Sequence, residues 1–97
     1  MNSSSPVWFI TGASSGLGRA LARHALARGY RVVATARQMA RLADLAAEAP
    51  DRVLTHALDV TAPGQAETAV AAALARFGRI DVLINNAGYG IVGAVEE

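Results

Sequence analysis

The chain has 97 residues, of which 53% are hydrophobic and 18% charged, with a formal net charge of +1. Length and composition predict one small globular domain, and the near-neutral charge offers no basic surface for nucleic acid. Cysteine is absent, which excludes disulfides, thiolate metal sites and a cysteine nucleophile. No signal-peptide core follows Met1, and the longest uncharged run, Val82 to Val95, is too short to span a bilayer. We therefore expect a cytoplasmic location and no membrane partner.

Apolar runs of strand length alternate along the chain with stretches of helical spacing. Strands are predicted at residues 7–11, 31–36, 53–58 and 80–85. Helices are predicted at residues 17–28 and 39–49, with a third that ends at Phe77. Gly29 and Gly78 follow the first and third helices, as expected of C-cap residues.

The third predicted helix has the clearest amphipathic pattern. Thr61 is its expected N-cap, with Pro63 in the first turn. Its buried face is expected to hold the apolar residues at helical spacing, namely Ala66, Val70, Ala73, Leu74 and Phe77.

The alternation of strands and helices predicts right-handed βαβ units in a doubly wound parallel sheet with strand order 3-2-1-4. The carboxyl ends of strands one and four then form the crevice in which such sheets bind ligands. The fourth strand is expected to lack an outer neighbour. Its apolar edge predicts a marginal chain that aggregates or associates.

A glycine-rich loop, Thr11 to Gly18, joins the first strand to the first helix. Its glycines follow the spacing Gly-x3-Gly-x-Gly, and no P-loop lysine ends it. Free backbone N–H groups and the helix dipole favour an anion at such a junction, and Ser14 and Ser15 add hydroxyl donors. The loop predicts a seat for a phosphate; the alternative is a tight turn that binds no ligand.

The second strand ends in Ala36 and Arg37, where an NAD-binding fold commonly carries an acid for the ribose 2′-hydroxyl. A guanidinium there can pair with a 2′-phosphate, which favours NADP over NAD. A solvated arginine at a strand end is the alternative.

Asp59 ends the third predicted strand and is followed by Val60. Its carboxylate can accept a hydrogen bond from the exocyclic amine of an adenine. It can equally accept from backbone N–H groups of the next loop, as Asp often does at a strand end. The spacing does not favour one role over the other.

Two adjacent amides, Asn85 and Asn86, end the fourth predicted strand. They can bind a ligand ribose or join neighbouring strand ends, and Ala87 and Gly88 leave the backbone bare for a flat ring system. A plain turn is the alternative.

Three motifs, in this order and spacing, resemble those of the short-chain dehydrogenase/reductase superfamily: the glycine loop, Asp59-Val60 and Asn85-Asn86-Ala87-Gly88. The resemblance is to the group with Thr-Gly-x3-Gly-x-Gly and Asn-Asn-Ala-Gly. The resemblance covers essentially the whole chain and implies a Rossmann fold with an NAD(P) cofactor. It implies a pyrophosphate loop at Gly12, Ser14, Ser15, Gly16, Leu17 and Gly18, a 2′-phosphate selector at Arg37, adenine contacts at Asp59 and Val60, and ribose and nicotinamide contacts at Asn86, Ala87 and Gly88. Thr11 and Asn85 are implied to brace the strand ends.

The resemblance also implies hydride transfer between NADP(H) and a small-molecule alcohol or carbonyl substrate, by enzymes that usually form homo-oligomers. The family's acid/base is a tyrosine with a lysine four residues on, and all nine basic residues of this chain are arginine. We therefore expect residues 1–97 to be a partial NAD(P)-binding Rossmann domain, a fragment without catalytic residues and inactive alone. A non-catalytic NADP(H)-binding module and a nonfunctional remnant are the alternatives.

The two histidines are expected to be structural. His24 falls in the first predicted helix and His56 in the third predicted strand. Neither has a second ligand at metal spacing, so no metal site is expected.

Overall fold

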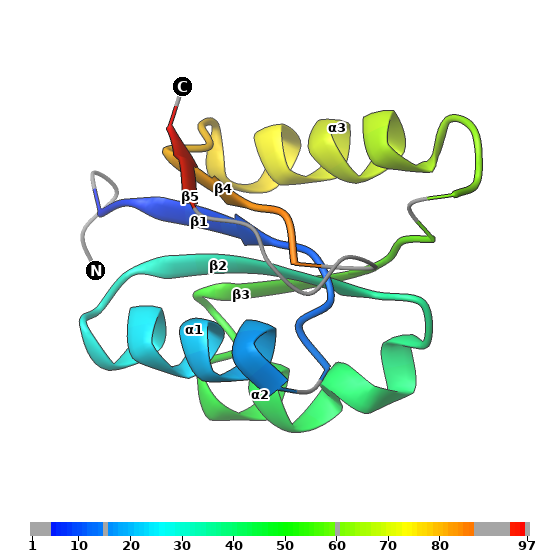
Figure 1. Cartoon of the computed structure of the whole chain (residues 1–97). Coiled ribbons are helices and arrows are strands. Elements are labelled where there is room, and N and C mark those ends of the chain that lie inside the picture. Colours follow the sequence, from blue (N-terminus) through cyan, green and yellow to red (C-terminus); the bar gives the residue numbers. More distant parts are fainter. Residues whose placement is uncertain (1–4, 15, 60, 87–93, 97) are drawn as a thin grey trace.

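The computed structural model describes residues 5–14, 16–59, 61–86 and 94–96, and it contains a five-stranded sheet of order β3-β2-β1-β4-β5 (Figure 1). The elements, in chain order, are β1 (Val7–Ile10), α1 (Gly16–Ala27), β2 (Arg31–Ala36), the 3₁₀-helix η1 (Met39–Leu42), α2 (Ala43–Glu48), β3 (Val53–Ala57), α3 (Gln65–Phe77), β4 (Val82–Ile84) and β5 (Ala94–Glu96). The first four strands are parallel, with Trp8 opposite Val32 on β2 and Val82 on β4. The predicted doubly wound sheet and its order 3-2-1-4 are confirmed.

The sheet lies between two helical layers, with α1 and α2 on one face and α3 on the other (Figure 1). Alternate residues of a strand point to opposite faces, and the core follows this rule. On β2, Val32 and Ala34 join the cluster under α1 and α2, whereas Val33 joins the cluster under α3. All six residues of β2 are buried, as expected of a strand covered on both faces.

Two predicted helix ends are confirmed by glycines in the left-handed region. Gly29 follows α1 with φ 84°, and Gly78 caps α3 with φ 80° while its N–H donates to the Leu74 carbonyl. A side chain is strained in this conformation, so glycine ends each helix at low cost.

The predicted start of the third helix is wrong. α3 begins at Gln65 with Gly64 as its N-cap, so Thr61 and Pro63 lie before the helix. The physical reason is a competing local contact, because the Thr61 hydroxyl donates to Asp59 Oδ1 at 2.6 Å. A hydroxyl used in this way does not cap the helix.

The predicted buried face of the third helix is partly wrong. Ala73 is buried, and Val70 and Phe77 are partly buried against the core. Leu74, however, is 46% exposed, and Ala69, outside the predicted face, is fully buried. The helix is rotated so that small alanines meet the sheet and allow close packing.

The expectation that the fourth strand lacks an outer neighbour is also wrong. β5 pairs antiparallel with β4, with Leu83 opposite Val95. The backbone groups on the outer edge of β4 therefore find partners in the same chain, which removes the unpaired edge that the sequence predicted there. None of the helices in the described part of the chain is long and apolar enough to cross a membrane.

Candidate functional site

The candidate site lies where β1 and β4 end side by side. These strands are parallel neighbours, with Ile10 opposite Ile84, and the chain order changes direction between them. The loop after β1 and the residues after β4 therefore meet at one edge of the sheet. In open α/β sheets this switch point is the usual ligand crevice.

The glycine loop adopts a conformation suited to an anion. Gly12 and Gly16 have φ of 64° and 59°, which other residues rarely adopt. Among the described residues, a Cβ added at Gly16 would meet nothing within 4 Å, so none of these side chains crowds the start of α1. The first turn of α1 carries no acidic residue, so no carboxylate there competes with a ligand anion for the N–H groups and the helix dipole.

Gly18 is required for a different reason, namely close contact. It is buried, and an added Cβ would lie 2.2 Å from the Gly12 carbonyl oxygen and 2.8 Å from Asn86 Nδ2. The first turn of α1 therefore packs directly on the loop backbone and on Asn86, the second residue after β4. The contact fixes the helix N-terminus relative to both loops.

Thr11 connects the two loops through one hydroxyl. Its Oγ1 donates to Asn85 Oδ1 at 3.1 Å and accepts from the Asn86 N–H at 2.8 Å. Asn86 Nδ2 also donates to the Gly12 carbonyl at 3.3 Å. Thr11 and Asn85 thus brace the ends of β1 and β4, as the resemblance implied. Ala87 and Gly88, the other residues predicted on this side, lie outside the described residues.

Arg37 lies directly after β2, one strand away from β1. Its side chain is exposed and forms no hydrogen bond or salt bridge within the part of the chain that the structure describes. The guanidinium is therefore available to an anion approaching this edge of the sheet.

Asp59 stands beyond the end of β3 and caps its own loop. Its Oδ1 accepts from the Thr61 hydroxyl at 2.6 Å and from the Thr61 N–H at 2.9 Å. These two hydrogen bonds, with a smaller contribution from the charge of Arg37, hold the pKa of Asp59 below its usual range. The loop-capping alternative is therefore realised, and the carboxylate remains charged at neutral pH. Val60, and Ser15 in the glycine loop, lie outside the described residues.

The remaining predicted loop residues lie at the rim of the same edge. Ser14 is partly buried, and its carbonyl accepts from Arg19 Nη1 at 3.4 Å. Leu17, in the first turn of α1, is 53% exposed. Leu17 is therefore an exposed apolar side chain next to Gly16 at the start of α1.

The histidines take the structural positions expected of them. His24 is exposed on α1, with its ring 6.3 Å from the ring of Trp8. The Nδ1 of His56 lies 2.8 Å from the Ala57 carbonyl. Among the described residues, no three His, Cys, Asp or Glu side chains gather as metal ligands.

The sequence interpretation missed Thr35, which joins β2 to the glycine loop through hydrogen bonds. Thr35 is fully buried in β2, and its hydroxyl donates to the Ile10 carbonyl at 3.1 Å. Its own carbonyl accepts from the Ala13 N–H at 2.9 Å. A lone threonine inside an apolar strand was the available signal. A buried hydroxyl needs a hydrogen-bond partner, so this threonine indicates a contact with a neighbouring backbone group.

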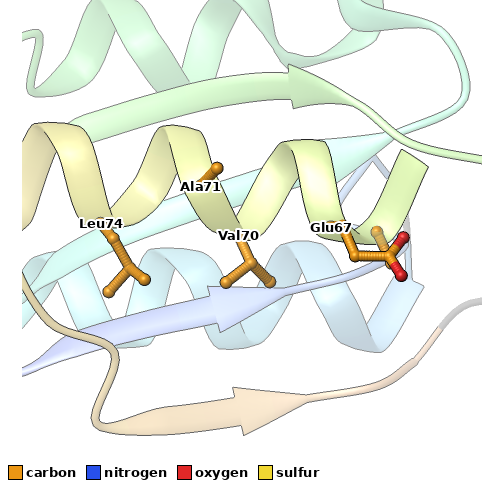
Figure 2. Close-up of a pocket in the computed structure, with 5 residues that line it drawn as sticks. Glu67, Val70, Ala71 and Leu74 are labelled. Atoms are coloured by element: carbon orange, nitrogen blue, oxygen red, sulfur yellow. The ribbon is translucent and has the colours of Figure 1, made fainter. Parts of the chain in front are cut away.

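A shallow hollow on α3 is separate from this edge of the sheet. It is lined by Ala66, Glu67, Val70, Ala71 and Leu74 (Figure 2). None of these residues belongs to the two loops or to the ends of β2 and β3. The hollow is apolar and presents no group that would bind a phosphate.

A parallel sheet with this strand order, a glycine loop and a helix N-terminus at its switch point defines a Rossmann-type nucleotide-binding fold. The chain belongs to the short chain dehydrogenase family, whose sequence pattern it matches over residues 6–97. It is 50% identical over 92 residues to Oxidoreductase BOA17 of Botryotinia fuckeliana, a match that covers 94% of this chain and 34% of that protein. The chain thus spans about a third of the length of the curated relatives it matches.

Solved structures show the same likeness. A short-chain dehydrogenase from Streptomyces avermitilis is 51% identical with a TM-score of 0.85, over 91% of this chain and 32% of that one. An actinorhodin polyketide ketoreductase solved with NADPH is 36% identical with a TM-score of 0.82, over 90% of this chain and 34% of that one. A 3-ketoacyl-(acyl-carrier-protein) reductase from Brucella melitensis, solved with NADH, is 37% identical with a TM-score of 0.76. The match covers 80% of this chain and 32% of that one. Of these relatives, one was thus solved with NADPH and another with NADH.

Proposed function

We propose that residues 1–97 form the NADP(H)-binding part of a short-chain oxidoreductase that transfers hydride between this cofactor and an alcohol or carbonyl substrate. The observation that carries the proposal is the crevice itself, in which the glycine loop and Asn86 are bonded through Thr11. Among the described residues, nothing lies within 4 Å of a Cβ added at Gly16, and the first turn of α1 carries no acid; both features suit an anionic group.

Each described residue then has a role that its position supports. The N–H groups at the start of α1 receive the pyrophosphate, and Asn86 faces the ribose on the nicotinamide side. Arg37, exposed at the end of β2, pairs with the 2′-phosphate in a charge-assisted hydrogen bond. Asp59 lies at the adenine end, where its Oδ2 makes no hydrogen bond within the described residues. The bound cofactor supplies the hydride donor or acceptor.

A second candidate function is NADP(H) binding without chemistry. These 97 residues hold no lysine, so they alone form no tyrosine-lysine acid/base pair. A cofactor bound here without a positioned acid/base would lose about 10²- to 10⁴-fold in rate. The two candidates share the same binding site and differ in turnover.

The proposal is tested by titrating the purified chain with NADPH and, in parallel, with NADH, following nicotinamide fluorescence. We expect saturable binding that favours NADPH. Arg37→Asp should weaken NADPH binding by about 10- to 100-fold, the loss expected for a charged hydrogen bond worth about 1.5–3 kcal/mol. NADH binding should change much less.

Arg41→Asp is the matched control for charge. Arg41 is also exposed and near the end of β2, and its side chain makes no hydrogen bond or salt bridge within the described residues. It should leave the preference between the cofactors within about twofold of the parent chain. An equal loss in both variants would mean that net charge, not the position of Arg37, sets the preference.

A further inference from the structure

Arg19 occupies a position where its charge needs compensation. It lies in the first turn of α1, where the positive end of the helix dipole disfavours a cation. Its guanidinium forms a salt bridge with Asp44 of α2, and its side chain is only 25% exposed. The salt bridge offsets the unfavourable location, so Arg19 is held against α2.

The same guanidinium lies between two backbone carbonyls. Its Nη1 is 3.4 Å from the Ser14 carbonyl oxygen and 3.5 Å from the Arg41 carbonyl oxygen. Ser14 belongs to the glycine loop, and Arg41 belongs to η1, which begins two residues after Arg37. A planar group with several fixed donors can hold two such segments at a set distance.

Arg23, on the same face one turn further along α1, provides a contrast within the chain. It pairs with Asp44 at 3.3 Å and with Glu48, but within the described residues it forms no hydrogen bond with a carbonyl of the glycine loop or of η1. Its side chain is 46% exposed. Arg23 therefore joins α1 to α2 without touching the candidate site.

We propose that Arg19 is a positioning residue for cofactor selection. It sets the distance between the glycine loop, which receives the pyrophosphate, and the segment that presents Arg37 to the 2′-phosphate. The inference rests on the proposed function, since only a cofactor that contacts both segments senses the distance between them. NADPH meets this condition, and NADH lacks the 2′-phosphate.

The test compares NADPH and NADH affinity in Arg19→Gln, Arg19→Lys and Arg23→Gln. Arg19→Gln should weaken NADPH binding about fivefold more than NADH binding, the size expected from losing one ordinary hydrogen bond. Arg19→Lys keeps the charge near the pyrophosphate but not the fork, and it should show the same selective loss. Arg23→Gln should leave the ratio of the two affinities unchanged.

Amide hydrogen exchange without cofactor gives a second readout. Exchange in residues 38–43 should rise in both Arg19 variants and stay unchanged in Arg23→Gln, with melting temperatures measured to confirm that each variant folds. An equal loss of NADPH and NADH binding in Arg19→Gln, restored in Arg19→Lys, would reduce Arg19 to a source of charge and overturn the inference. If the parent chain binds NADPH selectively and Arg19→Gln has the same ratio of NADPH to NADH affinity, this inference is overturned and the proposed function is not. A parent chain that binds neither cofactor would overturn the proposed function and this inference with it.

Discussion

The two faces of the sheet are covered to different degrees. On one face, α1, η1 and α2 bury a large cluster in which Leu42 and Leu45 are fully inaccessible. On the other face, α3 buries a smaller cluster of the described residues, and Leu74 remains 46% exposed. Figure 2 shows Val70 and Leu74 extending to the same side of α3. Within the described residues, the face that carries η1 is therefore the more completely packed one.

The first prediction would break the well-packed face. Leu45→Ala leaves a cavity under α2 and should lower the free energy of unfolding by about 3 kcal/mol. Leu74→Ala, the same change on α3, should cost less than about 1 kcal/mol because half of that side chain already meets water. Urea unfolding of both variants measures the difference. Similar losses would show that the two faces are equally important for stability.

The second prediction concerns Gly18, where α1 meets the glycine loop. Gly18→Ala should cost about 2 kcal/mol or more and weaken cofactor binding, because its Cβ would overlap the Gly12 carbonyl. Gly29 has a φ of 84°, and a Cβ added there would meet nothing within 4 Å among the described residues. Gly29→Ala should therefore cost only the backbone strain, about 1 kcal/mol, and leave cofactor binding unchanged. Thermal melts and NADPH titration separate the two. A Gly18→Ala chain that binds like the parent would show that the helix can shift without affecting the crevice.

The third prediction concerns Asp81, which joins β4 to β1 at the opposite edge of the sheet. Its Oδ2 accepts from the Val7 N–H at 2.7 Å, and its Oδ1 accepts from Arg79 at 2.7 Å. Partial burial raises the pKa of Asp81, but these hydrogen bonds and the charges of Arg79 and Arg31 outweigh it, so the net pKa is lowered.

Because the folded pKa lies below the unfolded value of about 3.9, Asp81 stabilises the fold above that pH and loses this effect as the pH falls through the folded pKa. Asp81→Asn should cost about 1 kcal/mol at pH 7 and flatten the stability profile below about pH 4. Asp51→Asn is the control, since Asp51 is exposed and makes no hydrogen bond within the described residues. The free energy of unfolding is measured from pH 2 to pH 7. The same pH dependence in both variants would contradict the prediction.

The sheet could be predicted because its signals are local. Four apolar runs and the helices between them define the parallel order, and β2 begins and ends at the predicted residues. The α3 face could not be predicted in the same way, because an alanine-rich helix offers two similar apolar stripes. Its rotation is decided by contact with the sheet, where Ala69 and Ala73 fit. β5 likewise depends on a contact with β4 that no local pattern announces.

In the candidate site, too, some features follow from local sequence and others depend on contacts between distant residues. Glycines with positive φ could be anticipated from the spacing at Gly12 and Gly16, since the sequence itself marks a tight turn. The contact of Gly18 with Asn86 joins residues far apart in the chain, so it appears only in three dimensions. The contact of Arg19 with the Arg41 carbonyl was missed for the same reason. Whether these residues bind the cofactor stays a prediction for the titrations above.

The hydroxyl of Thr11 has a consequence for binding thermodynamics. Because it donates to one residue after β4 and accepts from the next, we expect that ordering one of the two loops helps to order the other. A ligand group that stiffens one loop lowers the entropy cost of ordering the other. Linkage makes this effect reciprocal. The two ends of a dinucleotide would thus promote each other's binding through a protein hydroxyl that neither of them has to touch.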